Sequence, residues 1–310
     1  MTVLALPSGA RGLLAGIGNT PLVELSDLDR PPGGARVFAK LESRNPGGSI
    51  KDRPVARMLV AAWEAGAFEG GRRLLDSSSG NAGIAYAQIG AALGIGVTLV
   101  VPGNASRERL DRIRAHGAEL VLTDPIEGYD FALREARRLA TEQADRFHFG
   151  DQYANDENWR AHYETTAPEI LAQLAAAGAG PPDAFVCGVG TGGTLTGVAR
   201  RLRRSNPSLT VVATIPPPFP GIEGLKPLGE PEDIVPVILD ESLIDQRVAA
   251  DVDAAVDWTR RLARAGLFVG PSSGAYAAAA FELARTGDHA TVVTTLNDTG
   301  ERYGSTGLWG

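Results

Sequence analysis

Three glycine-bearing polar segments of the sequence each come directly before a segment with helical spacing. They cover residues 45–53 (NPGGSIKDR), 77–83 (SSSGNAG) and 188–194 (GVGTGGT). The first residues of a helix present unpaired backbone N–H groups and the positive end of the helix dipole. Glycine lets these groups approach an anion closely, because it has no Cβ in the way. Three such segments in one chain predict a site that binds several anionic groups at once.

The third segment has the composition of a phosphate-binding loop. Its letters also match part of the dinucleotide pattern G-x-G-x-x-G, but no acidic residue ends the next predicted strand, residues 210–214. No lysine follows its glycines, so it is not a Walker A loop. Its glycines alternate with hydroxyl side chains that can add hydrogen-bond donors: Gly190, Thr191, Gly192, Gly193 and Thr194.

Lys51 follows the first glycine pair and lies at the start of a predicted helix. This place is unfavourable for a cation, because the start of a helix is the positive end of its dipole. The same field favours the neutral amine, which suits a nucleophilic lysine that forms a Schiff base. A solvated surface lysine is the alternative, and the residues alone leave both interpretations open.

In order and spacing, the motifs resemble those of the fold-type II pyridoxal 5′-phosphate (PLP) enzymes. The similarity is strongest to the cysteine synthase branch, the O-acetylserine and O-phosphoserine sulfhydrylases, and cystathionine β-synthase is a near relative. Each motif is modest alone, whereas the ordered set is highly specific and covers about residues 14–308. The motifs are residues 17–23 (IGNTPLV), 45–53, 78–81 (SSGN), 165–170 (TTAPEI), 190–194 (GTGGT), 271–275 (PSSGA) and 300–303 (GERY).

The resemblance implies PLP as the cofactor. Lys51 is then the lysine that holds PLP covalently and later moves protons. The resemblance assigns the 5′-phosphate to Gly190 through Thr194, the ring hydroxyl O3′ to Asn81, and the pyridine nitrogen to Ser272. A serine hydroxyl cannot keep that nitrogen protonated as an aspartate does. The ring is therefore expected to be a weaker electron sink, which favours expulsion of a β-substituent over transamination.

The resemblance also implies a pocket for the substrate carboxylate. Ala82 stands where the family has threonine, so the loop lacks one hydroxyl and leaves room for a bulkier or differently held substrate. The pocket residues are expected to be Ser78, Ser79, Gly80, the backbone near Ala82, and Gln152.

The implied reaction is β-replacement on an O-activated L-serine, either O-acetylserine or O-phosphoserine, through an α-aminoacrylate. Sulfide or another sulfur donor then gives L-cysteine. One alternative is the same chemistry with an amine or homocysteine, as in diaminopropionate or cystathionine synthesis; another is a non-catalytic, partner-binding relative. Lys226 is a candidate for binding a phosphate leaving group, with a solvated loop lysine as the alternative.

The segments that must position these motifs alternate between strand and helix patterns, which is typical of parallel sheets covered by helices. We expect an α/β fold of two domains, each with a mostly parallel twisted sheet flanked by helices. The resemblance implies a larger PLP-binding domain of residues 1–40 and 150–310. It also implies a smaller mobile domain, residues 41–149, that carries the carboxylate loop.

The strongest patterns give the following elements, with an ordered loop at the proline-rich residues 216–236. Strands are predicted at residues 36–41, 73–75, 97–101, 119–122, 184–188, 210–214, 267–269 and 291–295, and helices at residues 53–65, 82–93, 106–116, 130–143, 161–177, 193–204, 252–266 and 274–286.

Composition narrows the class of protein further. The 310 residues include 30 Lys and Arg against 37 Asp and Glu, a net charge of −7, which argues against a nucleic-acid or anionic-membrane binder. The single cysteine, Cys187, excludes an internal disulfide framework and is expected to be a buried structural thiol. The four histidines are scattered, so no metal site is expected.

Cellular location and assembly are expected as follows. The sequence lacks a run of about 18 apolar residues and a secretory signal pattern, so we predict a cytoplasmic protein. The expected partners are a small-molecule amino acid and a sulfur donor, with sulfur arriving as sulfide or on a carrier protein. The resemblance implies a homodimer.

Overall fold

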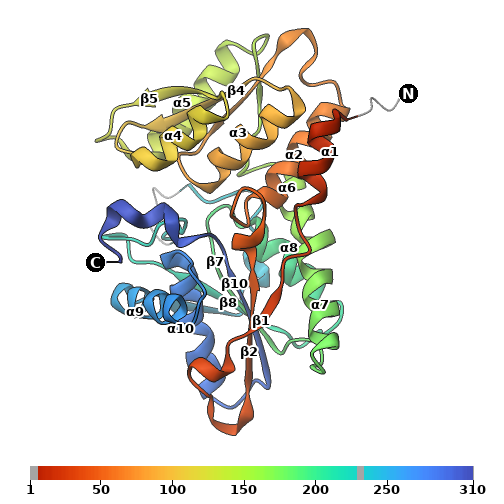
Figure 1. Ribbon diagram of the computed structural model, residues 1–310, viewed down its shortest axis with the longest axis vertical. Helices are drawn as coiled ribbons and strands as arrows, with labels where there is room; N and C mark the ends of the chain where they lie inside the picture. The colour runs from red at the N-terminus through yellow and green to blue at the C-terminus, as the bar shows by residue number, and fades with distance from the viewer. Residues whose placement is uncertain (1–5, 229–233, 310) are drawn as a thin grey trace. The chain divides into compact units, whose positions relative to one another are not determined.

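The computed structural model describes residues 6–228 and 234–309. The chain divides into two compact units. Unit 1 consists of Lys51–Asn158 with the described part of Met1–Ile17, and unit 2 consists of Gly18–Ile50 with the described part of Trp159–Gly310. Each unit contains one sheet with helices on its faces, so the predicted α/β fold with two mostly parallel sheets is confirmed (Figure 1).

Unit 1 has a four-stranded, fully parallel sheet in the order β5-β4-β3-β6. Helix α6 (Asp156–Ala161) begins in unit 1 and continues along the chain into unit 2. The strands are β3 (Arg73–Ser77), β4 (Val97–Pro102), β5 (Glu119–Thr123) and β6 (Phe147–Phe149), and the helices are α1 (Ser8–Ala15), α2 (Asp52–Glu64), α3 (Asn81–Leu93), α4 (Arg107–Ala115), α5 (Gly128–Glu142) and the short 3-10 turn η4 (Glu69–Gly71).

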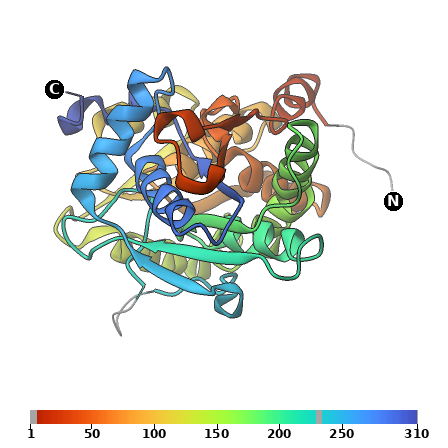
Figure 2. The same cartoon turned by 90° about the horizontal axis from the view of Figure 1, so that it is seen from below.

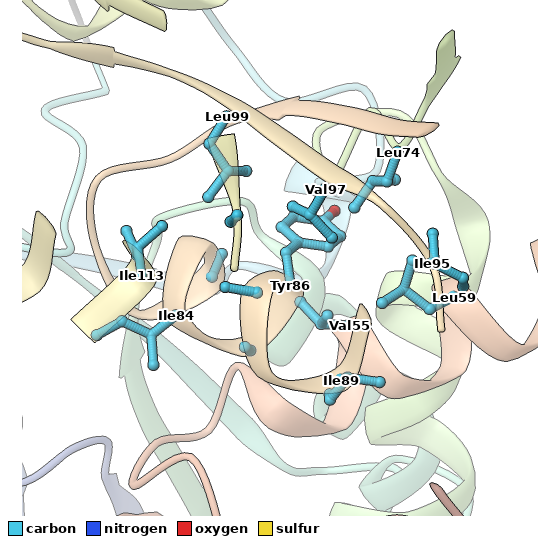
Figure 3. Close-up of a cluster of buried hydrophobic side chains, with 14 of the residues drawn as sticks. Val55, Leu59, Leu74, Ile84, Tyr86, Ile89, Ile95, Val97, Leu99 and Ile113 are labelled. Atoms are coloured by element: carbon cyan, nitrogen blue, oxygen red, sulfur yellow. The ribbon is translucent and has the colours of Figure 1, made fainter. Parts of the chain in front are cut away.

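The core of unit 1 follows from the alternation of side chains along β3. Leu74 belongs to a cluster with side chains of α2, α3 and α4, which Figure 3 shows packed around Tyr86. The next residue, Leu75, belongs to a separate cluster with Ala132 and Ala136 of α5. Successive strand residues point to opposite faces of a sheet, so a strand that is apolar on both faces is covered by helices on both.

Unit 2 has a six-stranded sheet in the order β1-β2-β10-β7-β8-β9, in which only the β1–β2 pair is antiparallel. Its strands are β1 (Leu22–Glu24), β2 (Arg36–Leu41), β7 (Ala184–Gly188), β8 (Thr210–Ile215), β9 (Gln246–Ala249) and β10 (Thr291–Leu296). Its helices are α7 (Ala167–Ala176), α8 (Gly193–Leu202), α9 (Val252–Arg264) and α10 (Pro271–Arg285), with the π-helix η5 (His162–Thr166) and the 3-10 turns η1 (Ser26–Leu28), η2 (Pro32–Gly34), η3 (Glu42–Arg44), η6 (Glu241–Leu243) and η7 (Gly300–Thr306).

The same alternation organises the core of unit 2. Val186 of β7 packs into a cluster with α9 and α10, whereas its neighbour Phe185 packs into a cluster with α7 and α8. Figures 1 and 2 show α9 and α10, in blue, on one side of this sheet, and α7, in green, on the other. The phosphate-loop candidate, residues 190–194, therefore connects a fully buried strand to a helix of the α7 and α8 layer.

Some helix boundaries and short elements in the structure differ from the prediction. Helix α10 begins at Pro271, three residues before the predicted start, because proline at the first position of a helix costs no hydrogen bond. The predicted helix over residues 161–177 is interrupted by the π-helical η5. The helix α1 and the strands β1, β6 and β9 were not predicted; the three strands have only three or four residues each, which carry little periodicity.

The proline-rich loop agrees with its prediction over the part that the structure describes. Residues 216–228 and 234–236 form neither helix nor strand. The acidic residues 230–233, expected as a solvated loop, lie outside the described residues. Among the described residues, no helix combines the length and apolar character that crossing a bilayer needs.

Candidate active site

Lys51 directly precedes the first residue of α2, at the end of a tightly held turn. Gly48 in that turn has φ +78°, a conformation that favours glycine. Its N–H donates to Asn45 O at 2.7 Å, and Ile50 N donates to Asn297 O at 2.8 Å. The backbone that leads to the Lys51 amine is therefore fixed on both sides of the turn.

A buried arginine reinforces the same turn. The Arg302 guanidinium donates to the backbone carbonyls of Gly47 and Gly48, the latter at 3.1 Å. The Asp298 carboxylate lies 3.8 Å from the same guanidinium and accepts a hydrogen bond from Tyr303 Oη at 2.8 Å. Within unit 2, residues 297–302 thus hold the segment that ends at Ile50.

The carboxylate-loop candidate lies between β3 and α3, with Gly80 immediately before the first helical residue. A Cβ at Gly83 would lie 2.2 Å from Ser78 O, so glycine is required for this close approach of loop and helix. Ser78 and Ala82 are buried, whereas Ser79, Gly80 and Asn81 are half-buried. The loop therefore keeps exposed polar atoms at the positive end of α3.

The structure places Gln152 against this loop, although 75 residues separate it from Ser77. Its Nε2 donates to Ser77 O at 3.0 Å, and Tyr129 Oη donates to the same oxygen at 2.6 Å. The Gln152 side chain is buried, and its Nε2 carries a second hydrogen available to a ligand. The structure thus brings together Ser78, Ser79, Gly80, Ala82 and Gln152, the residues predicted to bind the substrate carboxylate.

The phosphate-loop candidate opens α8. Gly192, the residue before the helix, has φ +82°, and a Cβ there would lie 2.7 Å from Leu239 Cβ. Gly192 has no side chain that could cap the helix. Gly193 N donates to Thr191 Oγ1 at 3.4 Å, and the N–H groups that follow it in the first turn of α8 can bind an anion. The buried Thr191 and the half-buried Thr194 add hydroxyls, and Thr194 Oγ1 lies 3.3 Å from His162 Nε2.

The loop of residues 216–228 packs beside the phosphate-loop candidate. Lys226 N donates to Val189 O at 2.7 Å. A Cβ at Gly188 would lie 2.0 Å from Leu225 Cδ2, so the two segments approach at van der Waals distance. The Lys226 side chain is half-buried.

Ser272 occupies the first turn of α10 and is buried. Asn297 Nδ2 donates to its Oγ at 3.4 Å, and Asn297 N donates to Ser273 Oγ at 2.9 Å. The amide of Asn297 is oriented by Thr295 Oγ1, which donates to its Oδ1 at 2.8 Å. The Ser272 hydroxyl accepts from an amide, so its own proton can be donated elsewhere.

These features fit PLP. Its phosphate matches a helix start with glycines and threonines, and a pyridine nitrogen matches a buried hydroxyl that can donate its proton. Unit 1 carries Lys51, Asn81 and the carboxylate-loop residues with Gln152, and unit 2 carries Gly190, Thr191, Gly192, Gly193, Thr194 and Ser272.

Comparisons with known proteins agree with this chemistry. The family described as "Pyridoxal-phosphate dependent enzyme" matches residues 13–298. A cysteine synthase of Aquifex aeolicus is 43% identical over 301 residues, which cover 94% of this chain and 90% of that protein. The chain belongs to the cysteine synthase family of PLP-dependent enzymes.

Solved structures extend the agreement within this family. The crystal structure of an O-ureido-L-serine synthase is similar with a TM-score of 0.86 and 39% identity, covering 96% of this chain and 94% of that one. A cysteine synthase from Entamoeba histolytica is similar with a TM-score of 0.86 and 32% identity, covering 96% and 90%. The predicted family, fold class, enzyme class and cofactor are thus confirmed.

Several residues that contact the predicted site segments were not predicted from the sequence. His162 is one of the four scattered histidines for which no metal-binding role is expected, yet it lies beside Thr194. Asn297 and Tyr129 carry no motif, and they contact Ser272 and Ser77. One signal was present in the sequence: Asp76 is an acidic residue that directly follows the apolar pair Leu74 and Leu75 in β3. Cys187 is buried as predicted, and its thiol donates to Gly188 O at 3.1 Å.

Proposed function

We propose that the chain catalyses PLP-dependent β-replacement on an O-activated L-serine, with sulfide or another sulfur donor giving L-cysteine. The cysteine synthase and O-ureido-L-serine synthase relatives support this reaction class. Within the structure, the observation that carries it is the hydrogen bond from Gln152 Nε2 to Ser77 O. This bond joins the two segments predicted to bind a substrate carboxylate.

PLP, when bound, supplies the electron sink that lets a proton leave Cα and a group leave Cβ of an amino acid. The N–H groups at the start of α8, together with the Thr191 and Thr194 hydroxyls, bind its phosphate. Asn81 binds the ring hydroxyl through its side-chain amide.

Ser272 is proposed to donate to the pyridine nitrogen. Its oxygen accepts from Asn297 Nδ2, so its proton is free for an acceptor. The start of α10 also places positive potential at Ser272, which disfavours a protonated pyridine. Both effects favour a neutral ring, suited to expulsion of a β-substituent.

Lys51 is proposed to hold PLP covalently and, once released, to accept the Cα proton. The turn before it is fixed by Arg302 and Asn297, so its backbone does not need to be ordered during the reaction. Ser78, Ser79 and the second Nε2 hydrogen of Gln152 orient the substrate through its carboxylate.

The direct test is a product screen with the purified protein loaded with PLP. O-acetylserine or O-phosphoserine is mixed with sulfide, and L-cysteine is measured by mass spectrometry. The proposal expects cysteine and a change of the visible cofactor absorption on addition of the activated serine. A protein that leaves both activated serines unchanged and shows no spectral change would instead be a non-catalytic, partner-binding relative.

A second nucleophile class is favoured by one comparison, since the O-ureido-L-serine synthase is 39% identical. Its name describes a serine that carries a ureido group on oxygen. The same screen therefore includes an oxygen nucleophile, an amine, homocysteine and thiosulfate beside sulfide. A product from one of these at a higher kcat/KM than cysteine would replace sulfide as the proposed nucleophile.

Lys226 is proposed to bind the leaving group of the substrate. Its backbone is bonded to Val189, directly before the phosphate-loop candidate, which supports a role for its ammonium in binding an O-phosphoserine phosphate. Lys226→Ala is expected to lower kcat/KM for O-phosphoserine about 10-fold relative to O-acetylserine. An unchanged ratio would identify Lys226 as a solvated loop lysine.

Assembly and location remain predictions. We propose a cytoplasmic homodimer that takes sulfur as sulfide or from a carrier protein, on the basis of the family resemblance. Mass measurement in solution tests the dimer, and a monomer at micromolar concentration would contradict it.

A further inference from the structure

A buried hydrogen-bond network lies directly behind the loop that we propose to bind the substrate carboxylate. Its centre is Asp76, the second-last residue of β3, whose side chain is completely buried. Asp76 Oδ1 accepts from Ser77 N at 2.7 Å, and Oδ2 accepts from Gln152 N at 3.3 Å. One carboxyl group therefore joins two segments that are 75 residues apart.

Further bonds close the network around the same two residues. Tyr129 Oη and Gln152 Nε2 both donate to Ser77 O, at 2.6 and 3.0 Å. Asn158 Nδ2 donates to Gln152 O at 2.7 Å. Ser77 and Gln152 are thus held at both their N–H and their C=O groups, which fixes one segment relative to the other.

We propose that Asp76 is a positioning residue for substrate recognition, which holds Ser77 and Gln152 in the register that lets the loop and the Gln152 amide bind one carboxylate together. The inference rests on the proposed function, because the carboxylate pocket is part of it. Asp76 contacts neither substrate nor cofactor in this arrangement. It acts only through the two backbone N–H groups.

Burial of an ionised carboxyl group at this position costs free energy. Burial, with a smaller contribution from the neighbouring Asp151, raises the pKa of Asp76 to about 7. The N–H groups of Ser77 and Gln152 and the Tyr86 hydroxyl, which lies beside the carboxyl, act in the opposite direction. Other ionisable groups around it are Tyr129, on α5, and Arg137, 3.9 Å from Asp151. An apolar residue would avoid this cost, so what the carboxyl supplies is its pair of hydrogen bonds.

The test uses Asp76→Asn in the PLP-loaded protein at pH 8, where the native carboxyl is ionised. Asparagine keeps the shape but turns an NH2 group toward one of the two N–H donors, so one of the two bonds is lost. Binding of L-alanine, which has the carboxylate but no leaving group, is titrated through the cofactor absorption. We expect its dissociation constant and the KM for O-acetylserine to rise about 10-fold or more, with kcat changed less than 3-fold and PLP content unchanged.

Thr98→Val is the matched control. Thr98 is buried on the adjacent strand β4, opposite Leu75, and its hydroxyl accepts from Arg73 Nε at 3.1 Å, away from the carboxylate loop. The dissociation constant of the Thr98→Val variant for L-alanine is expected to stay within 2-fold of the wild-type value. An unchanged constant in Asp76→Asn, or an equal rise in both variants, would overturn the proposal.

A second variant covers the case in which Asp76→Asn does not fold. In Gly150→Ala the methyl would lie 2.9 Å from Asp76 Oδ2 and displace the carboxyl, so the same rise is expected and an unchanged constant overturns the proposal. If the wild-type protein neither responds to L-alanine nor converts an activated serine, the proposed function fails and the inference fails with it. If the wild type is active and the variants bind L-alanine normally, only the inference fails.

Discussion

Two loops of the molecule each connect a buried strand to the start of a helix, but different contacts hold them in place. The carboxylate-loop candidate opens α3 and the phosphate-loop candidate opens α8, and both follow a buried parallel strand. The first is held from behind by the hydrogen bonds of Asp76, Tyr129 and Gln152. The second is held by the close packing of Gly188 against Leu225 and by one backbone bond, from Lys226 N to Val189 O. The first loop should therefore respond to pH and to lost side-chain hydrogen bonds, and the second to volume added at Gly188.

The largest effect expected from this difference is on the pH dependence of the free energy of unfolding. The pKa of Asp76 is raised to about 7 in the folded protein, so the folded state keeps a proton that the unfolded chain loses near pH 4. Stability should therefore fall as pH rises toward 7. At about 1.4 kcal/mol per pH unit, the wild type should lose about 3 kcal/mol between pH 5 and pH 8 relative to Asp76→Asn.

Urea unfolding of both proteins at the two pH values measures this difference directly. Titrating groups that are not coupled to Asp76 are common to the two proteins, so they cancel in the comparison. The same pH dependence in wild type and variant would show that Asp76 does not titrate in this range.

The next effect concerns volume at the phosphate-loop candidate. Gly188→Ala would place a methyl 2.0 Å from Leu225 Cδ2 and 2.7 Å from Tyr276 Cε1. Overpacking of this kind costs about 1–3 kcal/mol, and displacement of the strand end should weaken PLP binding about 10-fold. Gly180→Ala is the control, because a Cβ there meets open space. Titration of the apo-proteins with PLP checks the result, and equal affinities in the two variants would contradict it.

The smallest effect expected is that of Tyr129→Phe. It removes one of two donors to Ser77 O and leaves the Gln152 bond in place. A single buried hydrogen bond contributes about 1 kcal/mol, so KM for the activated serine should rise about 2- to 5-fold. Steady-state kinetics and PLP titration together check it. A larger change in PLP affinity than in KM would show that Tyr129 supports cofactor binding and not the carboxylate-loop candidate.

Much of the fold follows from local sequence patterns. Apolar runs such as residues 184–188 and 36–41 coincide with β7 and β2, because buried parallel strands are apolar on both faces. Helix ends were less predictable. Pro271 begins α10 earlier than the apolar spacing indicates, and η5 interrupts a pattern that reads as one helix.

The site divides in the same way between local and distant information. The loop residues themselves, such as Ser78 and Gly192, are recognisable because glycines and hydroxyls gather before a helix. The residues that hold the loops are harder to find: Gln152 is expected only from the family resemblance, and Asp76 is not expected, since the two meet only through sheet topology. His162 and Thr194 are likewise 32 residues apart and meet because α8 packs on η5, where a Cβ at Gly197 would lie 2.8 Å from His162 Cβ.

The most direct test is to identify the residue that holds the cofactor covalently. Borohydride makes a reversible bond between an amine and PLP permanent, and peptide mapping by mass spectrometry then identifies the labelled residue. We expect one pyridoxyl group per chain, on Lys51, and none in Lys51→Ala. A label on another lysine, or no label in a protein that still makes cysteine, would contradict it.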